Sequence, residues 1–313
     1  MSQTSPQFVA VHRIAGVTVR TESNVPLPRL HEEPFESFRV GSLEVDAYQR
    51  ICKVSLSSIT LPRLTPDERC DLLRCPHSLC SPAGWESPLL RVPVVRARLR
   101  DCLERCHSTH IELDYEQIII RDFAERRLDV FCMPTVEGYD AELYVASNFP
   151  RLFCTFLPVF SALLIHAAGV VVGQKAAVFL ASDGGGKTTA VQLGKGMPVL
   201  HDDQVILKRE AAAVVAHATP LGRNTSGPIQ ARLGGLFMLK KAQQFELVPL
   251  KPAAVAHCLW FGHQGYTHFL PKSLKARAFE VLGDACYRTP VYEMRFPKGH
   301  VDWDAIDAAM SQR

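Results

Sequence analysis

The chain has 313 residues, of which 47% are apolar and 21% charged, and its formal net charge is +3. This is an ordinary globular composition, so it excludes a wholly disordered chain, and the small net charge argues against a nucleic-acid partner. The most apolar stretch, 152–172, is interrupted by Pro158, His166 and Gly169, which argues against a membrane span or a membrane partner. The N-terminus lacks a charged start followed by an apolar run, so we expect a cytoplasmic protein.

The first half of the chain is expected to form a β-rich accessory domain, residues 1–150, that recognises the acceptor. Alternating apolar runs predict a twisted antiparallel sheet, and a proline- and cysteine-rich stretch, 61–88, interrupts them. Val95–His107 contains no proline or glycine and predicts a helix. The expected strands are Phe8–Val19, Ser37–Val45, Arg50–Ile59, Ile111–Asp114, Ile118–Arg121, Leu128–Phe131 and Ala141–Val145.

Ten cysteines are more than a chain of this length usually holds. Cys70, Cys75 and Cys80 are evenly spaced, and Cys102 and Cys106 would share one face of the predicted helix. A chain of this length without a signal peptide favours reduced thiols over disulfides. A zinc site is the alternative, although its usual C-x₂₋₄-C pairs are not clearly present at both ends.

The second half, residues 151–313, alternates strands with helices and so predicts an α/β architecture. Two apolar runs, Leu163–Val172 and Lys175–Ala181, are joined by Gly173-Gln174 and predict a β-hairpin. A glycine-rich segment follows the hairpin. The later predicted strands are Met197–Leu200, Gln204–Lys208, Ala212–Ala218, Leu233–Leu239 and Val291–Phe296, and the predicted helices are Lys187–Leu193, Lys251–Trp260, Lys272–Leu282 and Trp303–Met310.

The segment Ala181–Thr188, ASDGGGKT, is a Walker A motif in all but its first position, where alanine replaces glycine. Glycines let backbone N–H groups point inward at phosphate oxygens, and the following helix directs its positive end to the same place. Lys187 can reach the β- and γ-phosphates, and the Thr188 hydroxyl can coordinate Mg²⁺. The residues expected to contact ATP are Ser182, Asp183, Gly184, Gly185, Gly186, Lys187, Thr188 and Thr189.

A glycine-rich turn without a ligand is the alternative interpretation, but the flanking strand and helix favour nucleotide binding. Asp183 departs from the motif's usual chemistry, because a carboxylate beside phosphates repels them unless it faces solvent or a cation.

An acidic pair, Asp202-Asp203, follows the next predicted strand. Two adjacent carboxylates cannot both point inward on a regular strand, so a turn is expected to begin there. One carboxylate can coordinate Mg²⁺ and the other can accept a proton from an attacking hydroxyl. An aspartate-rich β-turn is the simpler alternative, but the position after a Walker lysine favours a site.

Together these elements resemble the C-terminal catalytic domain of the HPr kinase/phosphorylase family, from about residue 155 to the end. That family places a histidine at the head of a strand, then a β-hairpin, the phosphate loop and an Asp-Asp pair. The matching stretches here are Leu164–Val170, Gly173, Ser182–Thr188 and His201–Val205, and Leu233–Leu239 and Pro290–Phe296 look like the shorter homologues.

The resemblance implies a P-loop fold related to ATP-dependent PEP carboxykinase, and a role for each matching residue. Lys187 would hold the phosphates, and Thr188 and Asp203 would serve the metal. Asp202 would be the catalytic acid/base, with His166 close to its carboxylate. Bifunctional members of the family phosphorylate a seryl residue of a carrier protein and also remove that phosphate. They usually carry glutamate where this chain has Thr189, so kinase activity is the expectation.

The predicted function is therefore ATP-dependent phosphorylation of a hydroxyl, with a serine of a protein or peptide as the leading acceptor. A small-metabolite kinase is a second interpretation, but such enzymes begin at the phosphate loop, without a preceding hairpin. A nucleotide-binding regulatory or peptide-presenting subunit without turnover is the third, because Asp183 and Ala181 depart from the motif. The oligomeric state is open, with a homo-oligomer among the options.

Overall fold

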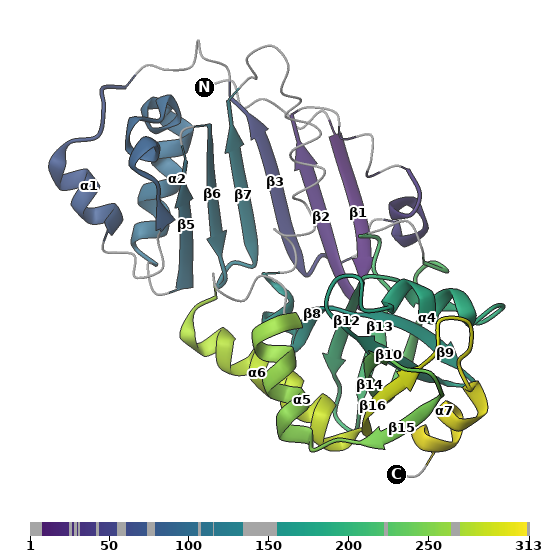
Figure 1. The fold of residues 1–313 in the computed structure, drawn as a ribbon. Coiled ribbons are helices and arrows are strands. Elements are labelled where there is room, and N and C mark those ends of the chain that lie inside the picture. The colour runs from purple at the N-terminus through teal and green to yellow at the C-terminus, as the bar shows by residue number, and fades with distance from the viewer. Residues whose placement is uncertain are drawn as a thin grey trace.

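The computed structural model describes residues 8–24, 27, 30, 32–41, 44–54, 61–73, 79–105, 108–114, 116–133, 155–221, 225–263 and 270–311. These residues form a mixed α/β structure with two sheets, one from each half of the chain (Figure 1). Among them, no helix combines the length and the apolar character needed to cross a bilayer.

The N-terminal sheet has the strand order β1-β2-β3-β7-β6-β5-β4. Its strands are β1 (Phe8–Ile14), β2 (Val17–Ser23), β3 (Ala47–Lys53), β4 (Leu79–Cys80), β5 (Thr109–Leu113), β6 (Gln117–Asp122) and β7 (Arg127–Cys132). Strand β3 runs parallel to both β2 and β7, and β4 runs parallel to β5, so the expectation of a purely antiparallel sheet is wrong. Alternation along a strand reports which face is buried and not the direction of its neighbour.

Two strand predictions in this half are also wrong. The run Phe8–Val19 is a hairpin, because Ala15 (φ 53°) and Gly16 (φ 71°) form a tight turn between β1 and β2. Ser37–Val45 contains no strand among its described residues, and a 3₁₀ helix, η2 (Phe35–Phe38), buries Phe35 and Phe38 instead. The predicted strand Ala141–Val145 lies outside the described residues.

Apart from η2, which contacts β1, the helices of the N-terminal half lie on the β5 side of its sheet (Figure 1). They are α1 (Pro66–Leu73), α2 (Pro93–Leu103) and the short 3₁₀ helices η4 (Pro82–Glu86) and η5 (Pro88–Arg91). Helix α2 begins earlier than predicted, since Pro93 suits a first helical turn, and it buries Val95, Leu99 and Cys102 against the sheet.

The C-terminal sheet has the order β11-β9-β10-β14-β13-β12-β8, extended by β16 on β14 and β15 on β16. Its strands are β8 (Ala162–His166), β9 (Ala168–Val172), β10 (Lys175–Leu180), β11 (Val199–His201), β12 (Gln204–Arg209), β13 (Val214–His217), β14 (Gln230–Lys241), β15 (Glu246–Pro249) and β16 (Val291–Phe296). The hairpin at Gly173-Gln174 is confirmed, because β9 and β10 pair antiparallel around it. The single predicted run Leu163–Val172 is divided into two strands, and β15 was not predicted.

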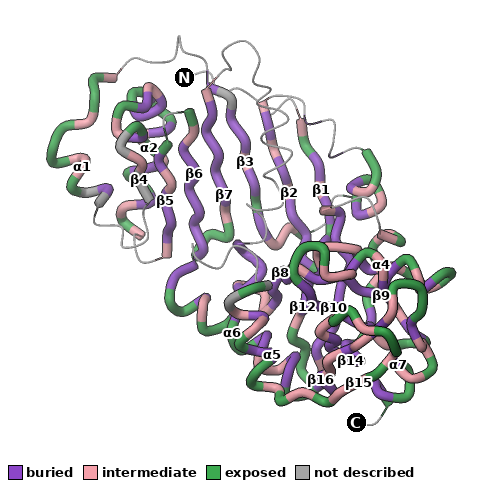
Figure 2. The backbone as a smooth tube through the Cα atoms, viewed as in Figure 1, coloured by how far each residue is buried: buried purple, intermediate pink, exposed green. Residues whose placement is uncertain are grey.

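Helices cover both faces of this sheet. They are η7 (Leu157–Phe160), α4 (Lys187–Leu193), α5 (Pro252–Cys258), the π-helical η8 (Leu259–His263), α6 (Lys272–Arg288) and α7 (Trp303–Met310). Along β10, Ala177 and Phe179 face the cluster under α4 and α7, whereas Val178 and Leu180 face the core on the α6 side. Burial on both faces explains why this strand is continuously apolar (Figure 2).

One buried apolar cluster continues from the N-terminal sheet into the C-terminal sheet. It contains Ile14 and Val17 of the first hairpin together with Leu164 of β8 and Leu207 of β12. The two halves therefore share a core.

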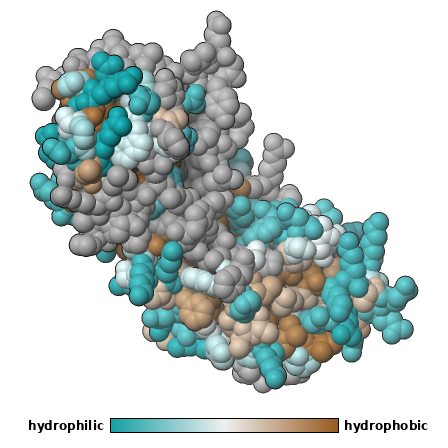
Figure 3. Space-filling view, turned by 60° about the vertical axis from the view of Figure 1, so that its left-hand side comes forward, coloured by the Kyte–Doolittle hydropathy of each residue, from teal (hydrophilic) through white to brown (hydrophobic). Residues whose placement is uncertain are grey.

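On the face seen in Figure 3, apolar residues also reach the surface of the C-terminal part between hydrophilic ones.

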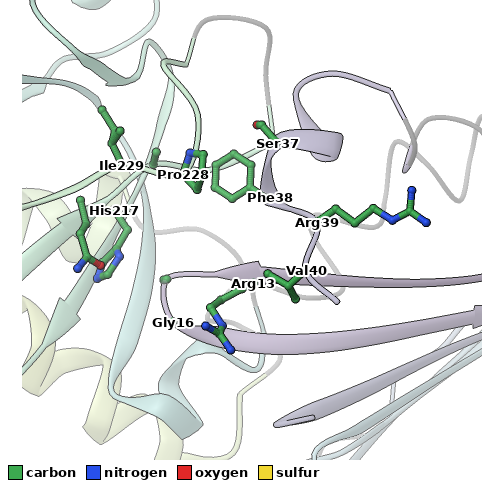
Figure 4. Close-up of a pocket in the computed structure, with 12 residues that line it drawn as sticks. Arg13, Gly16, Ser37, Phe38, Arg39, Val40, His217, Pro228 and Ile229 are labelled. Carbon is green, nitrogen blue, oxygen red and sulfur yellow. The ribbon is translucent and has the colours of Figure 1, made fainter. Parts of the chain in front are cut away.

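A pocket of about 330 Å³ lies where the first hairpin meets the ends of β13 and β14 (Figure 4). Arg13, Gly16 and Phe38 line it from one side, and His217 and Ile229 from the other. His217 is only 4% exposed. Its burial, together with the nearby Lys208 ammonium, lowers the pKa of His217 to about 4, so this imidazole is neutral at pH 7.

Candidate active site

The site is built at a bend in a two-stranded ribbon. Strands β8 and β9 pair antiparallel with β12 and β11, with His166 opposite Gln204 and Gly169 opposite His201. The ribbon is interrupted at Ala167 on one side and at Asp202-Asp203 on the other. Both long strands thus break at the same level, and the acidic pair lies in the break.

The glycine loop, residues 181–188, leaves the sheet beside this bend. Strand β10 pairs with β9 so that Phe179 lies opposite Ala168, and the loop begins directly after Leu180 (Figure 1). The register therefore brings the residues after Leu180 close to His166, which lies two residues before the start of β9. Three segments far apart in sequence meet here.

The backbone of the loop requires its glycines. Gly184 (φ 72°) and Gly186 (φ 106°) have left-handed conformations that L side chains rarely adopt. A Cβ atom on Gly185 would lie 2.5 Å from the Cβ atom of Ala181, and one on Gly186 would lie 3.0 Å from the ring of Phe296. Ala181, at the first motif position, therefore leaves no room for a side chain at Gly185.

Lys187 points back across this loop. Its side chain is buried, and its Nζ atom donates hydrogen bonds to the carbonyl oxygens of Ala181 at 2.8 Å and Ser182 at 3.5 Å. The same Nζ atom lies 3.8 Å from Oδ1 of Asp183, whose carboxylate is 94% exposed. Asp183 thus faces both solvent and a cation, the condition under which a carboxylate is tolerated at this position.

His166 joins the loop to the acidic turn. Its Nε2 atom lies 2.8 Å from Oδ1 of Asp203 and 3.4 Å from Oδ1 of Asp183. The resemblance implied that His166 would lie close to the Asp202 carboxylate, and the hydrogen bond seen here joins His166 to the neighbouring Asp203. Asp202 is the more enclosed carboxylate, with 17% of its side chain exposed against 51% for Asp203.

His201, to which no role was assigned from the sequence, holds the acidic turn from within. Its Nδ1 atom accepts the amide hydrogens of Asp203 at 2.9 Å and Gln204 at 2.8 Å. Burial lowers the pKa of His201, although Asp202 and Asp203 oppose that shift, so the imidazole is neutral at pH 7. The 3.6 Å approach of Asp202 Oδ1 to Nδ1 is therefore not an ion pair. The sequence signal was a histidine directly before two carboxylates at a strand end.

The chemistry of these residues suits a magnesium nucleotide. Side chains at Gly185 and Gly186 would meet Ala181 and Phe296, and Gly186 precedes the first turn of α4 without a side chain of its own. Glycine-rich turns of this kind can present successive backbone N–H groups to an anion. Magnesium is usually held by one or two carboxylates together with substrate phosphates, not by a full protein cage. The exposed Thr188 hydroxyl and the Asp202-Asp203 carboxylates are donors of that kind.

A cysteine zinc site finds no counterpart in the described part of the chain, where no group of three or more His, Cys, Asp or Glu side chains is arranged to hold a metal ion. Cys70 is exposed, and Cys102 is buried in the apolar cluster under α2. Burial raises the pKa of the Cys102 thiol to about 12, which keeps it protonated. Cys75 and Cys106 lie outside the described residues.

Comparison with known proteins gives little further information. No family model matches the sequence, and no curated protein matches it. Among solved structures, the chain is similar to the Hpr(Ser) kinase/phosphatase from Coxiella burnetii, at 13% identity and a TM-score of 0.24, over 43% of this chain and 85% of that one. Such a likeness carries no argument about function, which has to rest on the site itself.

Proposed function

We propose that this chain binds ATP with Mg²⁺ at the loop 181–188 and transfers the terminal phosphoryl group to a hydroxyl, with a serine of a protein or peptide as the leading acceptor. One observation carries the proposal: a buried Walker-type lysine lies in a glycine loop within reach of a histidine-linked acidic turn. Lys187, Asp183, His166 and Asp203 form an unbroken chain of contacts between 2.8 and 3.8 Å.

The loop and Lys187 have the binding role in this proposal. The Lys187 ammonium is held by neutral carbonyl oxygens of its own loop, which polyphosphate oxygens can replace with a gain in charge–charge attraction. Thr188 and Asp203 would hold the cation, and His166 would fix the Asp203 carboxylate by its hydrogen bond. Bound Mg²⁺ would neutralise charge on the phosphate oxygens.

Asp202 has the acid/base role. As the acceptor oxygen attacks the γ-phosphorus, its O–H bond breaks and the proton passes to the Asp202 carboxylate. The bond from the γ-phosphorus to the bridging oxygen of ADP breaks as the new P–O bond forms. The partial enclosure of Asp202 suits a base that must meet one hydroxyl and exclude bulk water.

The test is phosphoryl transfer from γ-labelled ATP to serine-containing peptides, with and without Mg²⁺. We expect Mg²⁺-dependent labelling that Asp202→Asn lowers by about 10²-fold or more, as expected for loss of a general base. Asp307→Asn, an exposed position on α7, is the matched control and should retain full activity. Equal labelling by the wild type and Asp202→Asn would overturn the assignment of the base.

A nucleotide-binding subunit without turnover is the second candidate. It is favoured by Asp183, because that carboxylate lies 3.8 Å from Nζ of Lys187, in the region that phosphate oxygens would enter. Tight Mg²⁺-dependent ATP binding without labelling of any hydroxyl or release of phosphate would select this candidate over the kinase.

A further inference from the structure

The turn that carries both carboxylates is organised around a single buried atom. The amides of Asp203 and Gln204 converge on Nδ1 of His201, at 2.9 and 2.8 Å. A backbone N–H can only donate, so Nδ1 must be the unprotonated acceptor and the ring proton must lie on Nε2. The side chain is 1% exposed, so this tautomer is fixed inside the protein.

The amide of Gln204 has a competing partner, the Asp202 carboxylate. An aspartate commonly accepts the N–H of the residue two positions later in an Asx turn, which here would direct the Asp202 carboxylate to the amide of Gln204. His201 occupies that amide instead. The Nδ1 lone pair also faces Oδ1 of Asp202 at 3.6 Å and disfavours a closer approach of the carboxylate to the same amides.

We propose that His201 is a positioning residue for the acidic turn: by taking the amides of Asp203 and Gln204, it keeps Asp202 out of an Asx turn and fixes the turn so that Asp203 meets His166 beside the glycine loop. This inference rests on the proposed function of the turn in phosphoryl transfer. His201 is buried and therefore does not touch the substrate. It acts by holding the backbone of Asp203 and Gln204, which neither the glycine loop nor the acidic pair does.

One ring nitrogen of His201 is buried at a cost in free energy, and this cost supports the positioning role. In the described part of the chain, Nε2 of His201 has no hydrogen-bond partner. An unpaired buried N–H group costs free energy of folding. A smaller side chain that accepts the same two amides would avoid this cost, so stability alone does not explain a histidine here. In return the imidazole supplies one acceptor, Nδ1, for the two backbone amides, and its Nε2–H group donates to neither carboxylate.

Two variants separate the two ring nitrogens. In His201→Asn the side-chain oxygen can take the place of Nδ1, whereas in His201→Gln the polar end takes the place of Nε2. We expect amide hydrogen exchange at Asp203 and Gln204 in the free protein to rise about tenfold or more in His201→Gln and to stay within about threefold in His201→Asn. The wild-type imidazole should show a ring proton on Nε2 by nitrogen NMR.

Steady-state kinetics complete the test. His201→Gln should lower kcat about 10- to 100-fold with the KM for ATP within about threefold, and His201→Asn should restore most of kcat. Equal exchange and equal kcat in both variants would overturn the positioning role. If the glutamine variant does not fold, a ring proton on Nδ1 of the wild type would overturn it. If the wild type transfers no phosphoryl group, the proposed function is wrong. Amide exchange in the free protein would then still test the hydrogen bonds from Asp203 and Gln204 to His201.

Discussion

The Nε2 atom of His166 lies 2.8 Å from Oδ1 of Asp203, which ties the end of β8 to the turn between β11 and β12. Because β9 starts two residues after His166 and is paired with the strand that enters the glycine loop, this hydrogen bond links the acidic turn to that loop. The contact holds one carboxylate oxygen of Asp203 in place.

Removal of the His166 ring should impair turnover more than binding. We expect His166→Ala to lower kcat about tenfold and His166→Gln, whose amide can still donate to Asp203, to keep kcat within about threefold of the wild type. His257→Ala, at an exposed position on α5, is the control. Identical kinetics for the alanine and glutamine variants would rule out the hydrogen bond as the cause.

Asp183 should weaken nucleotide binding. Its exposed carboxylate lies beside Lys187, and it would repel the phosphates that this lysine is expected to hold. We expect Asp183→Asn to lower the Kd for ATP about threefold at low ionic strength, with a smaller gain at 0.5 M salt because exposed charges are screened. Calorimetric titration at the two salt concentrations measures this. Weaker ATP binding by Asp183→Asn at both salt concentrations would show that the carboxylate assists the nucleotide.

Gly186 should tolerate no side chain. An alanine there would adopt a φ of 106° and bring its Cβ atom to 3.0 Å from the Phe296 ring. We expect Gly186→Ala to cost about 1–3 kcal/mol of unfolding free energy and to weaken ATP binding. Gly196→Ala is the matched control, since its φ of 82° is also left-handed but open space surrounds the added Cβ atom. Chemical denaturation should show a smaller loss for Gly196→Ala, and ATP binding by that variant should be unchanged.

His217 should make the protein less stable in acid. Its pKa of about 4 in the folded chain lies below the ordinary value of about 6.5, so the unfolded state binds more protons between these values. The stability linked to a neutral His217 is therefore fully present above pH 6.5 and is lost as the pH falls towards 4.

His217→Gln should remove this part of the pH dependence. Between pH 7 and pH 4.5 we expect the wild type to lose about 2 kcal/mol more unfolding free energy than the variant, from the linkage relation. His300→Gln, at an exposed position, should follow the wild type. The same loss in the wild type and in His217→Gln would mean that this imidazole titrates normally.

Local patterns predicted the C-terminal end of the chain well. The bounds of β16 and α7 agree with the predicted Val291–Phe296 and Trp303–Met310. Helix α7 has an unambiguous start, because the Asp302 side chain accepts the amide hydrogen of Ala305 at 2.9 Å. Helix α6 continues past the predicted end at Leu282, since tertiary packing outweighs the low helix propensity of Gly283.

The bend that builds the site could not be predicted in the same way. The residues from Leu163 to Val172 are apolar on both sides of Ala167, so periodicity gives no signal for the division into β8 and β9. Its position is set by the partner ribbon, where Asp202 and Asp203 interrupt β11 and β12. The sequence could thus identify the loop and the acidic pair, but not that His166 would contact Asp203.

The most direct measurement is calorimetric titration of the folded protein with Mg²⁺ and ATP, repeated on Lys187→Met and on Lys195→Met, an exposed lysine after α4. We expect the wild type and Lys195→Met to bind with a Kd in the micromolar range and Lys187→Met to bind at least about tenfold more weakly, as for the loss of one buried charge-assisted contact. No binding by the wild type, or the same Kd in all three proteins, would contradict a phosphate site at this loop.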